Sequence, residues 1–322
     1  MPDVCETMTT STNHLSFDKK NNIVAVFLAE FIRIRGVVGW FAISSVGFIL
    51  GMSPLPLSAY LVPLFVFLVS TFCIISFTFA INNRYDIDSD RRNHKKIHFN
   101  AMASGKISTE TGAFVNIIFV IIPPLTVTLL FNLWVFLFCL LLIFWMWAYS
   151  SPPLRLKGRP GADIIWHFIA FVLLVLWGSS IAGSLGLISW LVAVSIGVFS
   201  CIAQVLNHIN DYEFDRESGT VTYAVWRGLD TTVATLKVII ILHLVFLIPL
   251  IFLYSLAYSY TIGVLIAGIL VGIFVVETRK HALGSSAYYF PVVLGFAVYI
   301  NCVIYQIAVL FGEPIIGLSF LA

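Results

Sequence analysis

Long uncharged apolar runs recur along the chain and are separated by shorter polar segments. Each run approaches the length of about 20 residues that a helix needs to cross the hydrocarbon core of a bilayer. The runs predict nine transmembrane helices, at residues 24–51, 57–82, 109–131, 133–149, 162–183, 187–207, 230–253, 258–277 and 287–311. The sequence therefore predicts an all-α integral membrane protein.

Polar ends and helix-stopping residues set the limits of these elements. Phe131-Asn132 is expected to separate the third and fourth helices, and Pro123-Pro124 is expected to kink the third. The first 22 residues lack the apolar core of a cleavable signal peptide. The predicted organisation is a polar tail at 1–22, a transmembrane domain at 23–311 and a short tail at 312–322.

Composition agrees with this picture and excludes several classes of protein. Hydrophobic residues make up 60% of the chain and charged residues 11%, whereas soluble domains carry roughly 25% charged residues. A net charge of +2 gives no nucleic-acid surface. The five cysteines form no CxxC pair and four lie in apolar runs, so we expect buried small side chains, not disulfides or a zinc site.

The charged residues gather on one side of the predicted bundle. All 18 Lys and Arg residues lie in or next to the N-terminal tail and the connections after the second, fourth, sixth and eighth helices. Of the 16 acidic residues, only Glu313 falls on the other side. The positive-inside rule therefore predicts a multi-pass protein of the cell membrane with a cytoplasmic N-terminus and an outside C-terminus, as nine helices require.

One polar motif, N-x-x-x-D-x-x-x-D, follows both the second and the sixth predicted helices. The two copies are offset by 125 residues and comprise Asn82, Asp86 and Asp90, then Asn207, Asp211 and Asp215. On a continued helix, steps of four residues place these side chains along one stripe, while Asp88 and Glu213 fall off it. Carboxylates on one stripe repel each other unless a cation lies between them.

Oxygen ligands of this kind suit Mg²⁺, which takes the rest of its shell from water and substrate phosphates. The two motifs therefore predict Mg²⁺ sites that share one diphosphate. Basic residues beside the motifs are candidates for binding that diphosphate: Arg84, Lys95, Lys96 and Arg216. The connection after the fourth helix adds Tyr149, Arg155 and Lys157 around Pro152-Pro153, which make it rigid.

These motifs resemble those of the UbiA superfamily of intramembrane prenyltransferases, which has nine helices and Asp-rich motifs after the second and sixth. Ala103-Ser-Gly-Lys106-Ile-Ser108 is similar to its A-S-G-[RK]-[IL]-S stretch, and Asp215-Arg-Glu-Ser-Gly219 to its D-R-x-x-G stretch. The resemblance implies two four-helix pseudo-repeats plus one helix. It also implies that the six motif residues bind Mg²⁺ and diphosphate, that Arg33 is the first-helix arginine, and that Tyr149 acts with Arg155 or Lys157.

The Tyr149–Lys157 run is most similar to the chlorophyll-synthase and lycopene-elongase branches. One departure is Asn100-Ala101, where the family often has Arg-Pro, and Lys95 or Lys96 could replace that phosphate contact. The expected reaction is Mg²⁺-dependent transfer of a prenyl group from a polyprenyl diphosphate to a lipid-soluble acceptor. The acceptor could be a quinone precursor, a chlorophyllide-like molecule, a carotenoid or a glycerol lipid.

Asp86, Asp90, Asp211 and Asp215 are the predicted catalytic residues, and either Asp90 or Asp215 could take the proton released. His94, His98 and His208 are expected to be loop residues and not bases. Two other functions stay open: a cation-coupled transporter that uses the acidic repeats, and a non-catalytic membrane scaffold. Against the transporter, the repeats are parallel and no acidic residue lies at mid-bilayer.

Overall fold

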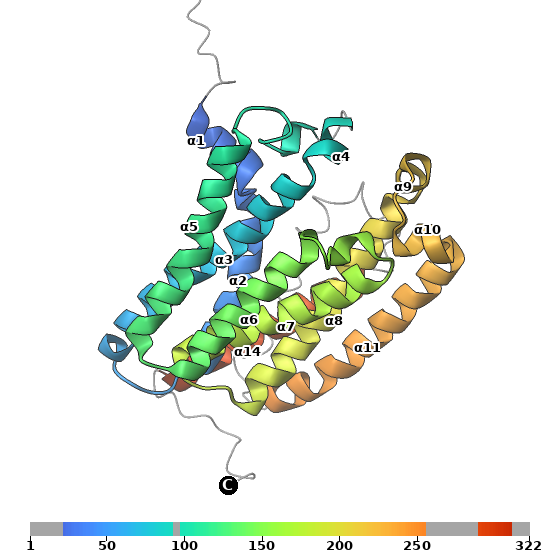
Figure 1. Cartoon of the computed structure of the whole chain (residues 1–322). Helices are drawn as coiled ribbons and strands as arrows, with labels where there is room; N and C mark the ends of the chain where they lie inside the picture. The colour runs from blue at the N-terminus through green and yellow to red at the C-terminus, as the bar shows by residue number, and fades with distance from the viewer. Residues whose placement is uncertain (1–21, 93–96, 256–288, 311–322) are drawn as a thin grey trace, which may run out of the picture.

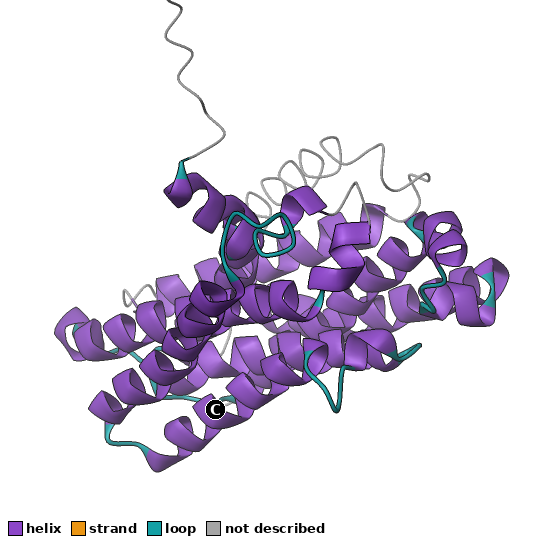
Figure 2. Ribbon diagram, turned by 45° about the horizontal axis from the view of Figure 1, so that its top comes forward, coloured by secondary structure: helices purple, strands orange, loops and turns teal. Residues whose placement is uncertain are grey.

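The computed structural model describes residues 22–92, 97–255 and 289–310, which form a bundle of long helices (Figure 1). These residues contain seven helices long and apolar enough to cross a membrane. The protein is therefore a multi-pass membrane protein, and Figure 2 shows only helices and loops in the described parts. The predicted helix at 258–277 and both predicted tails, apart from Asn22, lie outside the described residues.

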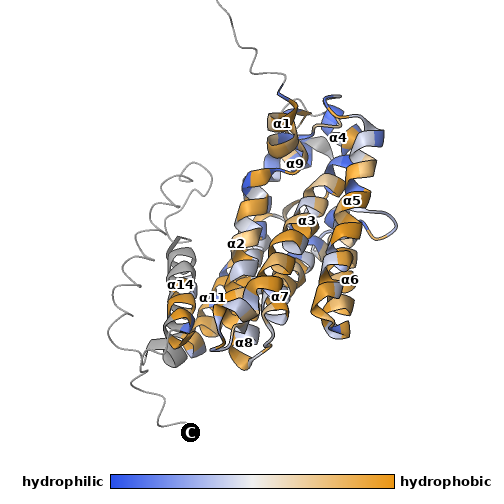
Figure 3. Cartoon of the chain, turned by 90° about the vertical axis from the view of Figure 1, so that its left-hand side faces the viewer, coloured by the Kyte–Doolittle hydropathy of each residue, from blue (hydrophilic) through white to orange (hydrophobic). Residues whose placement is uncertain are grey.

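The long helices follow the predicted order closely. They are α2 (Ile34–Gly51), α3 (Leu61–Tyr85), α5 (Thr109–Val127), α6 (Leu133–Ser150), α7 (Ala162–Ala182), α8 (Leu187–Asn210), α11 (Leu229–Ser255) and α14 (Tyr289–Leu310). Shorter helices are α1 (Ile23–Val26), α4 (Ile87–Arg92), α9 (Tyr212–Ser218) and α10 (Tyr223–Arg227). Apolar residues predominate along the long helices, and polar residues gather around α4 and α9 at one end of the bundle (Figure 3).

The prediction of one helix at 24–51 is wrong. The chain forms α1, a π-helical turn at Phe27–Phe31 and then α2, with Arg33 in the left-handed region at φ 53°. Asn83 of α3 stabilises this break, because its Nδ2 donates to the carbonyl oxygens of Glu30 and Phe31, each at 2.9 Å. Arg33 Nη2 in turn donates to Asn83 Oδ1 at 2.9 Å.

The predicted break between the third and fourth helices is confirmed. α5 runs through Pro123 and Pro124 and ends in a 3₁₀ turn, after which Phe131 adopts φ 48°. Asn132 then caps α6, since its Oδ1 accepts from the backbone N–H groups of Trp134 and Val135 in the first turn of that helix.

Small residues bring α2 and α7 into direct backbone contact. A Cβ on Gly47 would lie 1.8 Å from the carbonyl oxygen of Val175, and one on Gly178 would lie 2.1 Å from that of Ser44. Ser44 Oγ donates to Leu174 O at 2.8 Å across the same interface. Close approach through small residues is the usual way in which helices pack in a bilayer. α7 also packs against α3, α6 and α8, so it forms the centre of the bundle.

Candidate active site

Both acidic motifs interrupt a long helix in the same way. α3 ends at Tyr85 and α8 at Asn210, and the next residues, Asp86 and Asp211, have nearly equal dihedrals, φ −105° and ψ 5° against φ −92° and ψ 2°. A short helix begins at the next residue in each case and carries the third motif residue, Asp90 on α4 and Asp215 on α9. Both short helices lie at the same end of the bundle (Figure 1).

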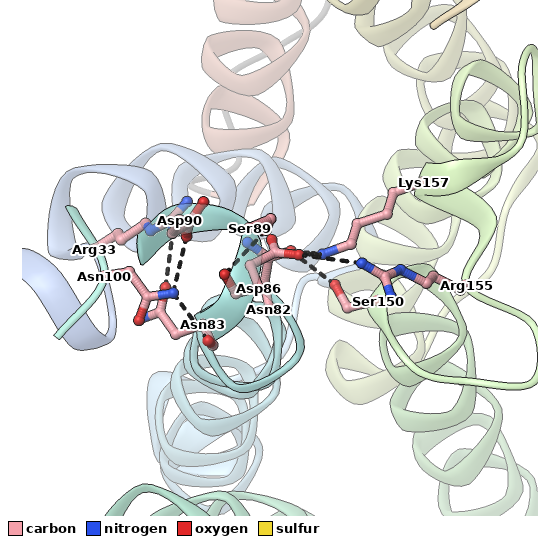
Figure 4. Close-up of polar contacts among 10 residues, drawn as sticks. All are labelled: Arg33, Asn82, Asn83, Asp86, Ser89, Asp90, Asn100, Ser150, Arg155 and Lys157. Carbon is pink, nitrogen blue, oxygen red and sulfur yellow. Dashed lines mark hydrogen bonds and ion pairs between the residues drawn. The ribbon is translucent and has the colours of Figure 1, made fainter. Parts of the chain in front are cut away.

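The first motif meets the connection after α6 through Lys157. Lys157 Nζ donates to Asn82 Oδ1 and to Asp86 Oδ1, each at 2.6 Å (Figure 4). Ser150 Oγ donates to the same Asn82 oxygen at 2.9 Å, and Arg155 Nη2 lies 3.8 Å from the same Asp86 oxygen. Residues far apart in the sequence thus form one polar cluster at the end of α3.

These contacts test whether the site fits a metal ion. Two hard oxygen atoms already converge on one cationic atom, so their lone pairs point toward a common position. Mg²⁺ prefers such oxygen ligands and completes its shell with water and phosphate oxygens. No three His, Cys, Asp or Glu side chains lie together in metal-binding range within the described part of the chain. Asn82 and Asp86 therefore fit a Mg²⁺ that obtains most of its shell from water and substrate.

Lys157 is well buried, with a side chain 14% exposed. Burial lowers its pKa, and the attraction of the Asp86 carboxylate opposes that shift. Burial also reduces screening by water, so the ammonium interacts more strongly with any anion beside it. Of the two basic residues left open by the sequence, Lys157 hydrogen-bonds to the motif, whereas Arg155 forms only a longer ion pair with Asp86.

Asp90 points to the other side of α4 (Figure 4). It is buried and accepts from Asn100 Nδ2 at 2.9 Å. Asn100 is fully buried, donates to Asn83 O, and accepts from the backbone N–H groups of Met102 and Ala103. Asn100 therefore organises the loop that carries the A-S-G stretch, which explains why asparagine stands at this departure from the family pattern.

The remaining predicted residues occupy varied positions. Asn207 and Asp211 are exposed, whereas Asp215 is buried. Arg216 forms an ion pair with Glu213 at 2.8 Å within α9. Arg84 is exposed, Arg33 is half-buried beside Asn83, and Lys95, Lys96 and His94 lie outside the described residues.

Comparison with known families decides the classification. The profile of the UbiA prenyltransferase family matches residues 38–294, which is most of the chain. The chain belongs to this family.

Relatives of the chain include other UbiA proteins. The structure of a UbiA homologue from Archaeoglobus fulgidus bound to GPP and Mg²⁺ superposes with a TM-score of 0.64 at 24% identity, over 87% of this chain and 99% of that one. The same homologue bound to DMAPP and Mg²⁺ gives 0.65 at 23%, over 88% and 98%. A lycopene elongase/hydratase from Corynebacterium glutamicum is 30% identical over 148 residues, 45% of this chain and about half (51%) of that protein.

One polar cluster of this UbiA protein was missed by sequence reasoning. His208 was expected to be a loop residue, yet it is buried in the last turn of α8, and its Nε2 lies 2.7 Å from Asp163 Oδ2. Gln204 Nε2 donates to the same carboxylate oxygen at 3.1 Å. The i, i+4 spacing of Gln204 and His208 was the available signal, because it puts both side chains on one face of a helix.

Tyr149 lies on an aromatic wall next to these residues. Its ring packs on that of Trp166 at 4.2 Å between centroids and meets the His167 ring edge-on at 5.5 Å. Trp166 Nε1 donates to Trp145 O, and Trp145 Nε1 donates to Trp166 O, so α6 and α7 are joined by a reciprocal pair of hydrogen bonds. The wall is thereby held in a fixed orientation.

Proposed function

We propose that this UbiA protein transfers a prenyl group from a prenyl diphosphate to a lipid-soluble acceptor, with Mg²⁺ at the two acidic motifs. The observation that carries the proposal is the convergence of Asn82, Asp86 and Lys157 at one point, in a chain that matches a prenyltransferase family. Asp211 and Asn207 would supply the second set of oxygen ligands from the exposed end of α8.

The first chemical step breaks the bond between the prenyl C1 and the diphosphate oxygen. The electron pair leaves with the diphosphate, and an allylic cation remains. Mg²⁺ bound by the motif oxygens would neutralise charge on the leaving group. Lys157 is placed to donate to the same group, with Arg155 as a second cation beside it. Fixed cations of this kind are usually the main source of rate enhancement at such sites.

The second step forms a bond between the cation and the acceptor. An electron pair of the acceptor attacks C1, and a proton then leaves the product. The Tyr149 ring, which is partly exposed and packs on the buried Trp166, offers a π face that can stabilise a cation. Asp90 or Asp215 is proposed to take the proton, and each is the buried third residue of its motif.

Among the four acceptor classes, we favour a carotenoid. The corynebacterial lycopene elongase/hydratase supports this choice, as does the resemblance of the Tyr149–Lys157 run to that branch. We also propose that the site faces the cytoplasm, because the basic residues gather at that end. No contact of the described residues favours the transporter hypothesis.

Diphosphate release from purified protein in lipid nanodiscs tests the proposal. Prenyl diphosphates from dimethylallyl to geranylgeranyl would be supplied with Mg²⁺ and an acyclic carotenoid, and the lipids analysed by mass spectrometry. We expect a product heavier than the acceptor by one prenyl unit, or by one prenyl unit plus water. Absence of diphosphate release with every donor and acceptor would refute transferase activity, whereas release with another acceptor class would refute only the carotenoid.

A further inference from the structure

A buried hydrogen-bond network links the two halves of the proposed site. Asp163 stands in the first turn of α7, directly after the connection that carries Lys157. Its Oδ2 lies 2.7 Å from Nε2 of His208, the residue that follows Asn207 of the second motif. Gln204 Nε2, one turn earlier on α8, donates to the same oxygen at 3.1 Å. Both the Asp163 and His208 side chains are at most 7% exposed.

The network forms one end of a continuous path between the motifs. Asn82 and Asp86 hold Lys157, and the backbone N–H of Ala162 bonds to Arg159 O at 3.0 Å where the connection joins α7. Asp163 then binds His208 at the end of α8. The position of the second motif relative to Lys157 thus depends on a bond with a defined direction and length.

The Asp163–His208 pair contributes little to the stability of the fold. Asp163 Oδ1 and His208 Nδ1 are buried and have no hydrogen-bond partner among the described residues. A buried polar pair with unsatisfied atoms contributes little to stability and is often replaceable by apolar residues without loss. Farther along the same interface, α7 and α8 do pack through small and apolar side chains at Gly197 and Val172. A polar pair at the end of the interface next to the motifs therefore indicates that the position of α8 relative to α7 must be fixed there.

We infer that Asp163, His208 and Gln204 are positioning residues, which hold the second motif at the distance from the first that lets both bind one cation-bound diphosphate. The inference rests on the proposed function. It assigns no proton transfer to the imidazole: His208 Nε2 acts through its hydrogen bond to Asp163.

The decisive variant replaces both partners of the pair, Asp163→Leu with His208→Leu. Binding of Mn²⁺ in the presence of inorganic pyrophosphate would be measured on the full-length protein from the EPR signal of the free ion, and the thermal midpoint would be measured on the same samples. Outer partners of metal ligands typically change metal affinity by about 10–100-fold. We expect the Mn²⁺ dissociation constant to rise by about that factor, with the thermal midpoint unchanged or higher.

Two further variants separate geometry from other roles. Glutamine places an N–H donor near the position of His Nε2, so His208→Gln should bind Mn²⁺ within about threefold of wild type, as expected for one retained hydrogen bond. The matched control removes the buried hydrogen bond between Ser195 of α8 and Tyr299 of α14, 2.8 Å long, by Ser195→Ala with Tyr299→Phe. This control should leave Mn²⁺ binding unchanged, whatever its effect on stability.

The inference is overturned if the double leucine variant binds Mn²⁺ like wild type. It is also overturned if His208→Gln binds Mn²⁺ normally but loses turnover, because that result assigns the imidazole a proton. If the double variant does not fold, Gln204→Leu carries the test, and an unchanged dissociation constant refutes positioning. A wild-type protein that neither binds Mn²⁺ with pyrophosphate nor releases diphosphate refutes the proposed function itself.

Discussion

Replacing Lys157 by methionine removes the cation that joins the first motif to the connection after α6, while keeping most of the side-chain volume. The ammonium makes two contacts of 2.6 Å and is largely shielded from water. Loss of one such donor to a developing anion costs about 10²–10³ in turnover, or about 3–4 kcal/mol. We therefore expect kcat/KM for diphosphate release to fall by about that factor.

Stability should respond much less than turnover. Leaving a fully buried charge without its partner costs about 3–5 kcal/mol. In the variant, however, Asp86 still has Arg155 at 3.8 Å, and the Asp86 side chain is 18% exposed. Removing the ammonium also relieves the desolvation that lowers the Lys157 pKa. We expect the free energy of unfolding to fall by no more than about 2 kcal/mol. Thermal unfolding in the same nanodiscs would measure it.

Arg159→Met is the matched control for this experiment. Arg159 lies in the same connection and carries the same charge, but it is exposed and its Nη2 donates to the Pro153 carbonyl, at 3.2 Å, and not to a motif residue. We expect its kcat/KM to stay within about threefold of wild type, as for a surface charge. The reasoning is refuted if Lys157→Met retains activity within that range, or if both variants lose activity equally.

Further predictions concern the metal ligands and the packing of the fold. Asp86→Ala and Asp211→Ala should each lower diphosphate release by at least about 100-fold without loss of expression, and EDTA should abolish wild-type release until Mg²⁺ is restored; a double variant active in EDTA would contradict this. Gly47→Ala should destabilise the protein by about 3 kcal/mol or more in thermal unfolding, because its Cβ would overlap backbone, whereas Gly39→Ala has open space and should not; equal midpoints would contradict it. Asn100→Ala removes four hydrogen bonds and should cost about 3 kcal/mol; a change below about 1 kcal/mol would show that the loop does not depend on them.

Hydropathy predicted each of the long described helices, because a bilayer span needs a long apolar run and such a run can be recognised from neighbouring residues alone. The break at Arg33 escaped it. Nothing in residues 24–51 stops a helix at that point, and the stabilising bonds come from Asn83, some 50 residues away. Breaks stabilised by a distant side chain are invisible to a local pattern.

In the candidate site too, features set by neighbouring residues were predicted, whereas contacts between distant residues were not. The motifs were expected at helix ends, where Asp86 and Asp211 do lie, and the proline-rich connection indicated that Lys157 would be held in place. The single stripe predicted for the first motif is wrong, because α3 ends at Tyr85 and Asp90 contacts Asn100, on the other side from the Asp86–Lys157 contact. The partner of His208 was not predictable, because Asp163 lies 45 positions earlier and the two meet only when α7 packs on α8. Contacts within one helix can be predicted from sequence spacing, whereas contacts between helices depend on how the helices pack and cannot be predicted in this way.

The position of both motifs at helix C-termini has a consequence for the order of binding. The C-terminal end of a helix carries partial negative charge from its free carbonyl groups, which adds to the charge of the carboxylates there. The carboxylates at the ends of α3 and α8 repel a diphosphate, and the helix ends add to this only in part, because α4 and α9 begin one residue later with N-termini that favour anions. On the proposed function, cations would have to reverse the sign of the potential before the donor binds. Lys157 would supply one such charge from the protein and divalent ions at the motif oxygens the others, so we expect affinity for the donor to depend steeply on the divalent ion.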